Sequence, residues 1–205
     1  GPIFFFFLNS DEDITPVTAT VTQRDPEAGN AITGTTVDDF DVIVDAVADP
    51  VNLTATDVVG LEDNPVALNI NTSLIDTDGS EEITEILIAN VPAGFTLNAG
   101  TEVSPGNFVV NQADLPTLTL TPPADYSGTI TLDVIVTNEE VNFSDTEFNF
   151  ANNDNVTSIP FDVTFNPVAD APSLVVNNPI VKEDGSVDLE IEATLQDNSE
   201  SLIVT

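Results

Sequence analysis

The chain has 205 residues, 41% of them hydrophobic, and its 36 acidic against 2 basic residues give a net charge of −34. That charge excludes nucleic acid and anionic membrane surfaces as direct partners, since both are bound through basic surfaces. The sequence contains no Cys and no His, which also excludes disulfides, soft-metal sites and thiolate or imidazole nucleophiles. No apolar run approaches the length that spans a membrane, so we expect no membrane insertion.

Residues 1–49 are expected to supply the C-terminal strands of a repeat that precedes the complete one. Two segments carry this prediction, because Ile14–Thr22 matches Thr129–Thr137 and Asp38–Val44 matches Ser158–Thr164. Both pairs alternate apolar and polar residues, as half-buried strands do.

The apolar run Ile3–Leu8 contains four consecutive Phe residues, whose side chains would point to both faces of a strand. It has two interpretations. One is a strand buried on both faces, and the other is an interface with another chain, or an aggregation hazard if the strand is left unpaired.

Residues 50–170 are expected to form the one complete repeat. Short segments rich in Val, Ile, Leu and Thr predict strands, turn-forming Gly, Pro, Asn and Asp lie between them, and no segment has a helical period. Many short strands at this spacing predict an all-β, antiparallel β-sandwich of the immunoglobulin type. The predicted strands are Leu53–Val59, Val66–Asn71, Ile83–Ile88, Phe95–Leu97, Phe108–Val110, Thr117–Thr121, Thr129–Thr137, Thr146–Phe150 and Pro160–Phe165.

Residues 171–205 repeat the start of the complete unit, so they predict the N-terminal strands of a following one. Glu62 and Asp63 recur 121 residues later as Glu183 and Asp184. The chain ends inside the expected third strand of this last repeat. It is therefore interpreted either as a piece of a tandem array or as an open edge that another chain completes head to tail.

Acidic residues gather at the ends of the segment Leu61–Glu82 and again in its copy, which predicts sites for a hard cation. Ca²⁺ is the cation that fits, because it takes six to eight oxygen ligands from carboxylates, carbonyls and water. We expect an interdomain site in which linker and turn carboxylates meet. The predicted ligands are Asp49, Glu62, Asp63, Asp76, Asp78 and Glu81, and in the copy Asp170, Glu183, Asp184, Asp197 and Glu200.

The loop before each linker is a second candidate source of ligands, with Asp25 and Glu27 in the first repeat and Glu139 and Glu140 in the second. The alternative for any single carboxylate is a solvated surface charge, which we prefer for Glu85, Glu102 and Glu147. Paired carboxylates also occur in glycoside hydrolases, but those enzymes need a cleft with aromatic platforms, and Trp is absent while Tyr occurs once. We therefore expect no enzyme.

Four phrases occur in order along the chain: LEDNPVALNINTSLIDTDGSEEIT, VPAGFTL, LTLTPPADYSGTITLDVIVT and FNPVADAPSL. They resemble the tandem immunoglobulin-like, cadherin-like repeats of giant bacterial surface adhesins of the RTX type. The resemblance implies an extender module of a long extracellular protein at the bacterial cell surface, stiffened by Ca²⁺, which acts in adhesion and biofilm formation. Its partners would be neighbouring repeats of the same chain.

Two alternatives to the extender stay open at this point. One is a structural subunit of a surface filament or matrix, assembled from several copies of the chain. The other is an adhesin module that binds a ligand through a loop.

Overall fold

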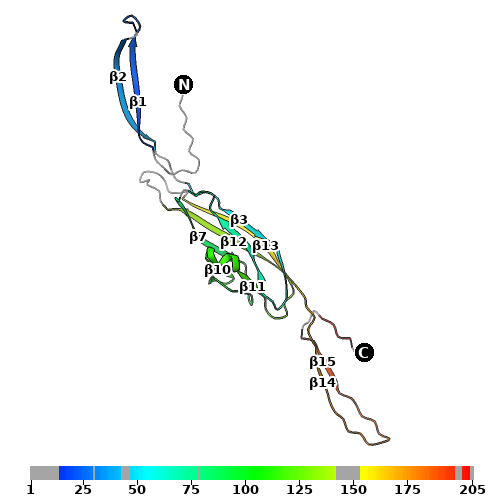
Figure 1. Cartoon of the computed structure of the whole chain (residues 1–205). Helices are drawn as coiled ribbons and strands as arrows, with labels where there is room; N and C mark the ends of the chain where they lie inside the picture. The colour runs from blue at the N-terminus through cyan, green and yellow to red at the C-terminus, as the bar shows by residue number, and fades with distance from the viewer. Residues whose placement is uncertain are drawn as a thin grey trace. The chain divides into compact units, whose positions relative to one another are not determined.

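The computed structural model describes residues 14–29, 31–42, 47–77, 79–141, 153–196 and 200–203. Over this part the chain is all-β, with one short 3-10 helix (Figure 1). No described helix is long and apolar enough to cross a membrane. The elements are β1 (Ile14–Asp25), β2 (Ala31–Val42), β3 (Asn52–Thr56), β4 (Val58–Leu61), β5 (Val66–Ala67), β6 (Asn69–Ser73), β7 (Glu81–Ala89), β8 (Thr96–Leu97), β9 (Thr101–Ser104), β10 (Asn107–Val109), η1 (Gln112–Thr117), β11 (Thr119–Thr121), β12 (Gly128–Glu140), β13 (Asp154–Asn166), β14 (Ser173–Val176) and β15 (Ile191–Thr194).

One predicted strand, Leu53–Val59, is divided in the structure. It becomes β3 and β4, which belong to different sheets, and Asp57 lies between them. The Asp57 side chain accepts a hydrogen bond from the backbone N–H of Asp162 in β13, at 2.9 Å. Asp57 therefore marks the point at which the chain leaves one sheet and joins the other.

A second predicted strand, Val66–Asn71, is also divided, into β5 and β6. Between them the backbone N–H of Leu68 donates to the carbonyl of Leu118, at 2.9 Å. The short strand β9 and the helix η1 were not predicted, whereas the predicted strand Thr146–Phe150 and the run Ile3–Leu8 lie outside the described residues.

The largest sheet in the described part of the chain has six strands in the order β4-β13-β12-β7-β10-β9. Strand β4 runs parallel to β13, with Val58 opposite Val163 and Leu61 opposite Asn166. Strand β10 is antiparallel to both of its neighbours. A three-stranded sheet has the order β5-β11-β8, and β1-β2, β3-β6 and β14-β15 form two-stranded sheets.

The chain divides into two compact units, and each is composed of segments that are distant in sequence. Unit 1 comprises residues 1–53, 72–85 and 136–157, and unit 2 comprises residues 54–71, 86–135 and 158–205. Every boundary between these segments falls inside a strand. The repeat boundaries predicted near residues 50 and 170 remain predictions from the sequence.

Unit 2 contains an apolar core to which both β12 and β13 contribute alternate residues. Leu132 and Val134 of β12 and Phe165 of β13 are 0–1% exposed. The Phe165 ring lies 5.9 Å from the ring of Phe95 and 6.1 Å from that of Tyr126, and the last two meet edge to face at 4.9 Å. This alternation is what a strand with one buried face requires, and burial of these side chains is the main stabilising term of the unit.

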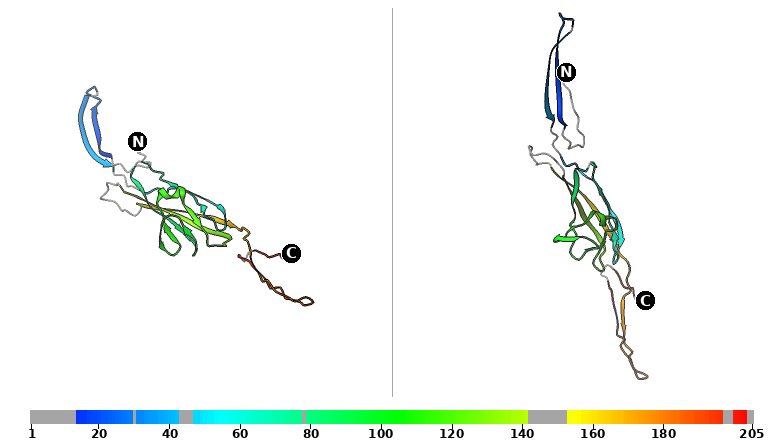
Figure 2. Two further views of the ribbon diagram at one scale, coloured as in Figure 1. Left: turned by 60° about the horizontal axis from the view of Figure 1, so that its bottom comes forward. Right: turned by 60° about the vertical axis from the view of Figure 1, so that its left-hand side comes forward.

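Unit 1 differs, because more polar than apolar side chains are buried in its described part. Its buried apolar residues are Ala48, Val51, Leu53 and Val136, whereas its buried polar residues are Thr72, Asp76, Ser80, Glu81, Asn138 and Glu140. The unit also contains the long antiparallel hairpin β1–β2 (Figure 2). On this hairpin Val21 and Val37 are 70% and 58% exposed. Among its described residues, unit 1 therefore buries a larger share of polar side chains than unit 2 does.

The hairpin β14–β15 repeats β3–β6 in structure as well as in sequence. Shifted by the 121-residue repeat distance, β14 falls on β3 and β15 falls on β6. Asp63 and its copy Asp184 also share the left-handed backbone conformation, with φ of 61° and 62°. The two strand pairs β3–β6 and β14–β15 differ in burial, since Leu53 is 8% exposed and its copy Leu174 is 65% exposed.

Replacement of Leu120 by Ala is expected to lower the free energy of unfolding by about 2–5 kcal/mol, because Leu120 is 0% exposed and the substitution leaves a cavity. The matched control is Leu189→Ala, since Leu189 is 65% exposed and its truncation should change stability by less than about 0.5 kcal/mol. Urea titrations of both variants in Ca²⁺-containing buffer measure the difference. Equal losses in the two variants would contradict the assignment of Leu120 to the core.

Candidate metal centre

Three aspartates of unit 2, Asp63, Asp125 and Asp170, come together and are called the aspartate cluster below. One carboxylate oxygen from each lies within 4.8 Å of the others, and the cluster could hold a metal ion. Asp63 follows β4, Asp125 lies in the turn before β12 and Asp170 follows β13. Asp63 and Asp125 are exposed and Asp170 is half-buried, so the cluster is accessible to solvent.

The backbone at two members of the cluster is held in the left-handed region, where Asp is one of the few residues tolerated. The φ angles are 61° at Asp63 and 58° at Asp125. The backbone N–H of Asp125 donates to Oδ1 of Asp63 at 2.9 Å, which links the two turns directly. The two carboxylates are therefore positioned by local backbone geometry before any ion binds.

Glu62 fixes the segment that carries the third aspartate. Its backbone N–H donates to the carbonyl of Asn166 at 3.0 Å, and its Oε1 accepts a hydrogen bond from the N–H of Val168 at 2.5 Å. Its side chain is 0% exposed, and its second oxygen, Oε2, has no hydrogen-bond partner. The turn after β4 thus holds residues 166–168 in place and brings Asp170 close to Asp63.

The electrostatics of the aspartate cluster favour a bound cation. Three carboxylates this close repel one another, and the chain has only two basic residues, Arg24 and Lys182, which are both exposed. Oxygens that ligate one Ca²⁺ ion lie at most about 5 Å apart, twice the Ca–O distance of 2.3–2.6 Å. The spacing within the cluster meets that condition, and its donors are all oxygen, the element that Ca²⁺ and Mg²⁺ prefer.

The structure distributes the predicted ligands over two places rather than one. In unit 2, Glu62 and Asp63 lie with Asp170, the linker aspartate that follows the complete repeat. In unit 1, the N–H of Asp49 donates to Oε1 of Glu81 at 2.5 Å. Asp76 is 8% exposed and belongs to unit 1, whereas Asp78 lies outside the described residues.

The predicted copy of the site is present only in part among the described residues. The N–H of Asp170 donates to Oε1 of Glu200 at 2.5 Å, which repeats the bond between Asp49 and Glu81. Glu183 and Asp184 are exposed, in the turn between β14 and β15. Asp197 lies outside the described residues.

Sequence reasoning missed Asp125 and Asn138. Asp125 lies in an ordinary turn between two predicted strands, Thr117–Thr121 and Thr129–Thr137, and no spacing in the sequence relates it to Asp63. For Asn138 a signal existed, because the buried face of β12 continues in steps of two from Leu132 to Glu140. That alternation places Asn138 and Glu140 on the inward face.

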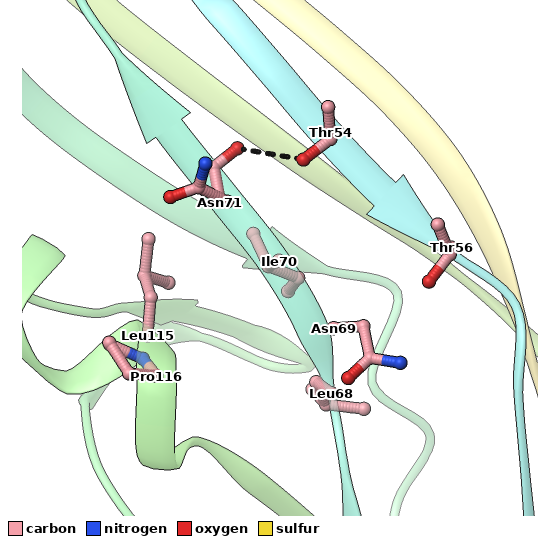
Figure 3. Close-up of a pocket in the computed structure, with 8 residues that line it drawn as sticks. All are labelled: Thr54, Thr56, Leu68, Asn69, Ile70, Asn71, Leu115 and Pro116. Carbon is pink, nitrogen blue, oxygen red and sulfur yellow. Dashed lines mark hydrogen bonds between the residues drawn. The ribbon is translucent and has the colours of Figure 1, made fainter.

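A pocket of about 300 Å³ lies elsewhere in unit 2 (Figure 3). Strands β3 and β6 and the helix η1 line it, and the Thr54 hydroxyl donates to the Asn71 carbonyl at 3.4 Å across one side. Hydroxyl and amide groups supply the polar part of this lining, which contains no ionisable side chain. The pocket therefore offers no group for the acid–base chemistry of a paired-carboxylate enzyme. The lining residues are Thr54, Thr56, Leu68, Asn69, Ile70, Asn71, Leu115 and Pro116.

A scan against protein-family models found no match, and a search of curated proteins found no significantly similar sequence. The likeness to adhesin repeats therefore depends on the sequence phrases alone. The chain is all-β with several sheets, as that likeness requires.

Asp125→Asn is expected to weaken Ca²⁺ binding at the aspartate cluster by at least about ten-fold, because it removes one of three charged ligands. Asn tolerates the left-handed backbone at this position, so the turn should persist. Tb³⁺ luminescence sensitised by Tyr126, the one Tyr of the chain and the next residue, measures the affinity by Ca²⁺ competition. Asp188→Asn, which removes an exposed charge outside the cluster, is the control. Equal affinities for the two variants would contradict a metal centre here.

Proposed function

We propose that this chain is a Ca²⁺-rigidified extender module of a long extracellular bacterial adhesin, with a mechanical role in cell adhesion and biofilm formation. The observation that carries the proposal is the aspartate cluster, in which two turns of unit 2 meet the segment that follows β13. A site at that position links the end of one repeat to the residues that lead into the next. The extracellular location at the bacterial surface comes from the sequence resemblance.

The order of the strands supports an immunoglobulin-like sandwich for the complete repeat. In that fold one sheet has the order A-B-E-D and the other contains C, F and G. The pairings β3-β6 and β5-β11-β8 match the first sheet when β5 and β6 are taken as one interrupted strand B. The run β13-β12-β7 matches G-F-C in the second, with β4 as the short parallel strand beside G.

Ca²⁺ is the proposed ion because the aspartate cluster is partly exposed to water and made of oxygen donors. Mg²⁺ demands near-octahedral geometry and gives up its waters reluctantly, whereas Ca²⁺ accepts varied arrangements of carboxylates and water. A bound divalent cation would attract all three carboxylates and would so offset the repulsion between them. Affinity for the folded chain alone would then add to its stability.

The residues of the chain explain how such a site would stiffen a junction. Glu62 holds the backbone at Asn166 and Val168, so the segment after β13 is already fixed at its start. Asp170 is the next point of attachment, and it is held only if its carboxylate is bound together with those of Asp63 and Asp125. With a cation bound, three of the five residues 166–170 would be attached to the sandwich, namely Asn166, Val168 and Asp170. Without it, repulsion favours release of Asp170.

The stiffening can be measured with spin labels, since the chain contains no Cys and labelling sites can be introduced freely. Labels at Val59→Cys in β4 and Val175→Cys in β14, which are 66% and 60% exposed, report on the two sides of residues 166–170. The distance distribution from double electron–electron resonance should be narrow in millimolar Ca²⁺ and broad in excess chelator.

The control pair for this measurement is Val59→Cys with Val103→Cys, which are both exposed and lie in the same six-stranded sheet. The width of its distance distribution should not depend on Ca²⁺. If the Val59–Val175 distribution has the same width in Ca²⁺ and in chelator, the extender proposal is wrong.

One observation favours the alternative of assembly between chains. The face of the β14–β15 hairpin that corresponds to the buried face of β3–β6 is exposed, with Leu174 at 65% and Ile191 at 59%. Their counterparts one repeat earlier, Leu53 and Ile70, are 8% and 6% exposed. The same sequence element is thus covered in one repeat and uncovered in the other, and a second copy of the chain would supply a covering surface.

Sedimentation velocity over a range of concentrations tests this alternative. Assembly predicts a mass that increases with concentration, and Leu174→Asp should abolish the increase by placing a charge on the face to be covered. Val175→Asp, on the opposite face of β14, is the control and should assemble as the original chain does. A monomer at all concentrations would exclude assembly and leave the extender.

A further inference from the structure

Another pocket of unit 2, of about 320 Å³, lies where the short strands β9 and β10 meet the segment before β8. Residues 91–95 form one wall, and β9, β10 and the turn between them form the other. The lining residues are valine, proline, alanine, glycine and phenylalanine, apart from one carboxylate, that of Glu102. The pocket is called the Glu102 pocket below.

The register of the six-stranded sheet explains why a carboxylate lies in this pocket. Phe108 of β10 is opposite Ile88 of β7 on one side and opposite Glu102 of β9 on the other. Residues directly opposite each other share one face of a sheet, and Ile88 is 0% exposed. The core face therefore continues from Ile88 to Phe108 and ends at Glu102, on the edge strand β9.

The two walls of the Glu102 pocket are joined at Gly106. The backbone N–H of Val91 donates to the Gly106 carbonyl at 3.0 Å, and the N–H of Gly106 donates to Oε1 of Glu102, also at 3.0 Å. Gly106 has a φ of 77°, and a Cβ at this position would lie 2.6 Å from the carbonyl oxygen of Val91. Only glycine permits this approach. The carboxylate and the apolar walls are thus in place before any ligand binds.

The lining of the pocket defines the charge of a ligand. A carboxylate attracts a cation, and phenylalanine rings such as that of Phe108 add to the attraction through their faces. None of the described residues that line the pocket is basic, and the net charge of −34 draws cationic partners to the chain. The pocket beside η1 has no ionisable side chain in its lining, so it offers no such selection.

The apolar walls define the rest of the ligand. Ligand pockets in proteins measure about 300–1,000 Å³ and combine a mainly apolar lining with a few placed polar groups. A metal ion would leave the apolar walls in contact with water, whereas a Lys or Arg side chain has an apolar stem and a charged end. Proline and other small apolar residues beside it would cover Pro92 and Pro105, as peptides do in proline-recognition grooves lined by aromatic rings.

We propose that the Glu102 pocket binds a peptide segment of a partner protein in which Lys or Arg lies next to proline or another small apolar residue. The cation pairs with Glu102, and the apolar residues pack on Phe108 and the two prolines. The site adds partner binding to a module whose proposed role is mechanical. It depends neither on the extender function nor on an ion in the aspartate cluster.

The site can be located by nuclear magnetic resonance with a defined peptide. Acetyl-Pro-Val-Lys-Pro-amide, titrated into the isotope-labelled chain in Ca²⁺-containing buffer, should shift the backbone resonances of residues 91–95 and 102–108. Acetyl-Pro-Val-Glu-Pro-amide reverses the charge of the peptide and should shift none of them. Shifts spread over acidic surface residues without those of the two segments would show general attraction to the charge of the chain and would overturn the proposal.

A third peptide, acetyl-Gly-Ser-Lys-Gly-amide, keeps the cation and removes the apolar groups. It should bind at least about ten-fold more weakly than the Pro-Val-Lys-Pro peptide, because it leaves the apolar walls uncovered. Equal affinities for the two Lys peptides would show that charge alone is recognised, and the pocket would then have no role.

Glu102→Gln tests the carboxylate, since the amide oxygen can still accept the hydrogen bond from Gly106 and the pocket should keep its shape. Glu102 is exposed, so the substitution should weaken binding of the Pro-Val-Lys-Pro peptide by about three- to five-fold, as expected for a partly solvated ion pair. Glu85→Gln, which removes an exposed charge outside the pocket, is the matched control and should bind as the original chain does. If Glu102→Gln also binds as the original chain does, the proposal is wrong, and Glu102 is instead a charge that protects the edge strand β9 from pairing.

Discussion

Repulsion between carboxylates is the constraint on which the rest of this structure depends. The chain has 36 acidic residues and 2 basic ones, and its fold places several of the acidic side chains in groups instead of spreading them over the surface. The aspartate cluster joins two turns of unit 2 to the segment that follows β13. Contacts of this kind oppose folding unless positive charge compensates them. Within the described chain the two basic side chains are exposed, which leaves cations from solution as the source.

The described parts of the two units bury different kinds of side chain, and strand β12 shows the change along a single face. Its buried positions are Leu132, Val134 and Val136, and then Asn138 and Glu140. The first residues belong to an apolar core that also includes the rings of Phe95 and Phe165. The last two are polar, and they lie in the part of β12 that belongs to unit 1. The inward face of one strand thus changes from apolar to polar side chains along its length.

Much of the fold could be predicted because alternation of apolar and polar residues determines strands locally. Strands β11 and β12 follow that pattern, and the repeat distance of 121 residues relates β14–β15 to β3–β6. The division of Leu53–Val59 could not be predicted, since Asp57 ends β3 by accepting a hydrogen bond from Asp162, more than a hundred residues away. Such a contact leaves no periodic signal.

The candidate sites were predictable to the extent that their residues repeat. The repeat singled out Glu62, Asp63 and Asp170, which the structure brings together, and it singled out Asp49 with Glu81. The repeat distance alone does not say which turn a linker aspartate lies beside, because the turns of both neighbouring repeats are within its reach. Asp125 carries no signal, as it occurs once and in an ordinary turn. Asn138 carries a signal, because the buried positions of β12 continue in steps of two beyond its last buried apolar residue, Val136.

The most direct test of cation-dependent folding is the free energy of unfolding as a function of Ca²⁺ concentration at constant ionic strength. Each ion that binds the folded chain alone contributes a slope of about 0.6 kcal/mol per unit of the natural logarithm of Ca²⁺ concentration. The aspartate cluster alone predicts a slope of about 0.6 kcal/mol at concentrations above its dissociation constant, and Na⁺ at matched ionic strength should have no such effect. A slope of zero, or the same stabilisation by Na⁺, would show that the carboxylates are screened rather than bound and would contradict the cation site.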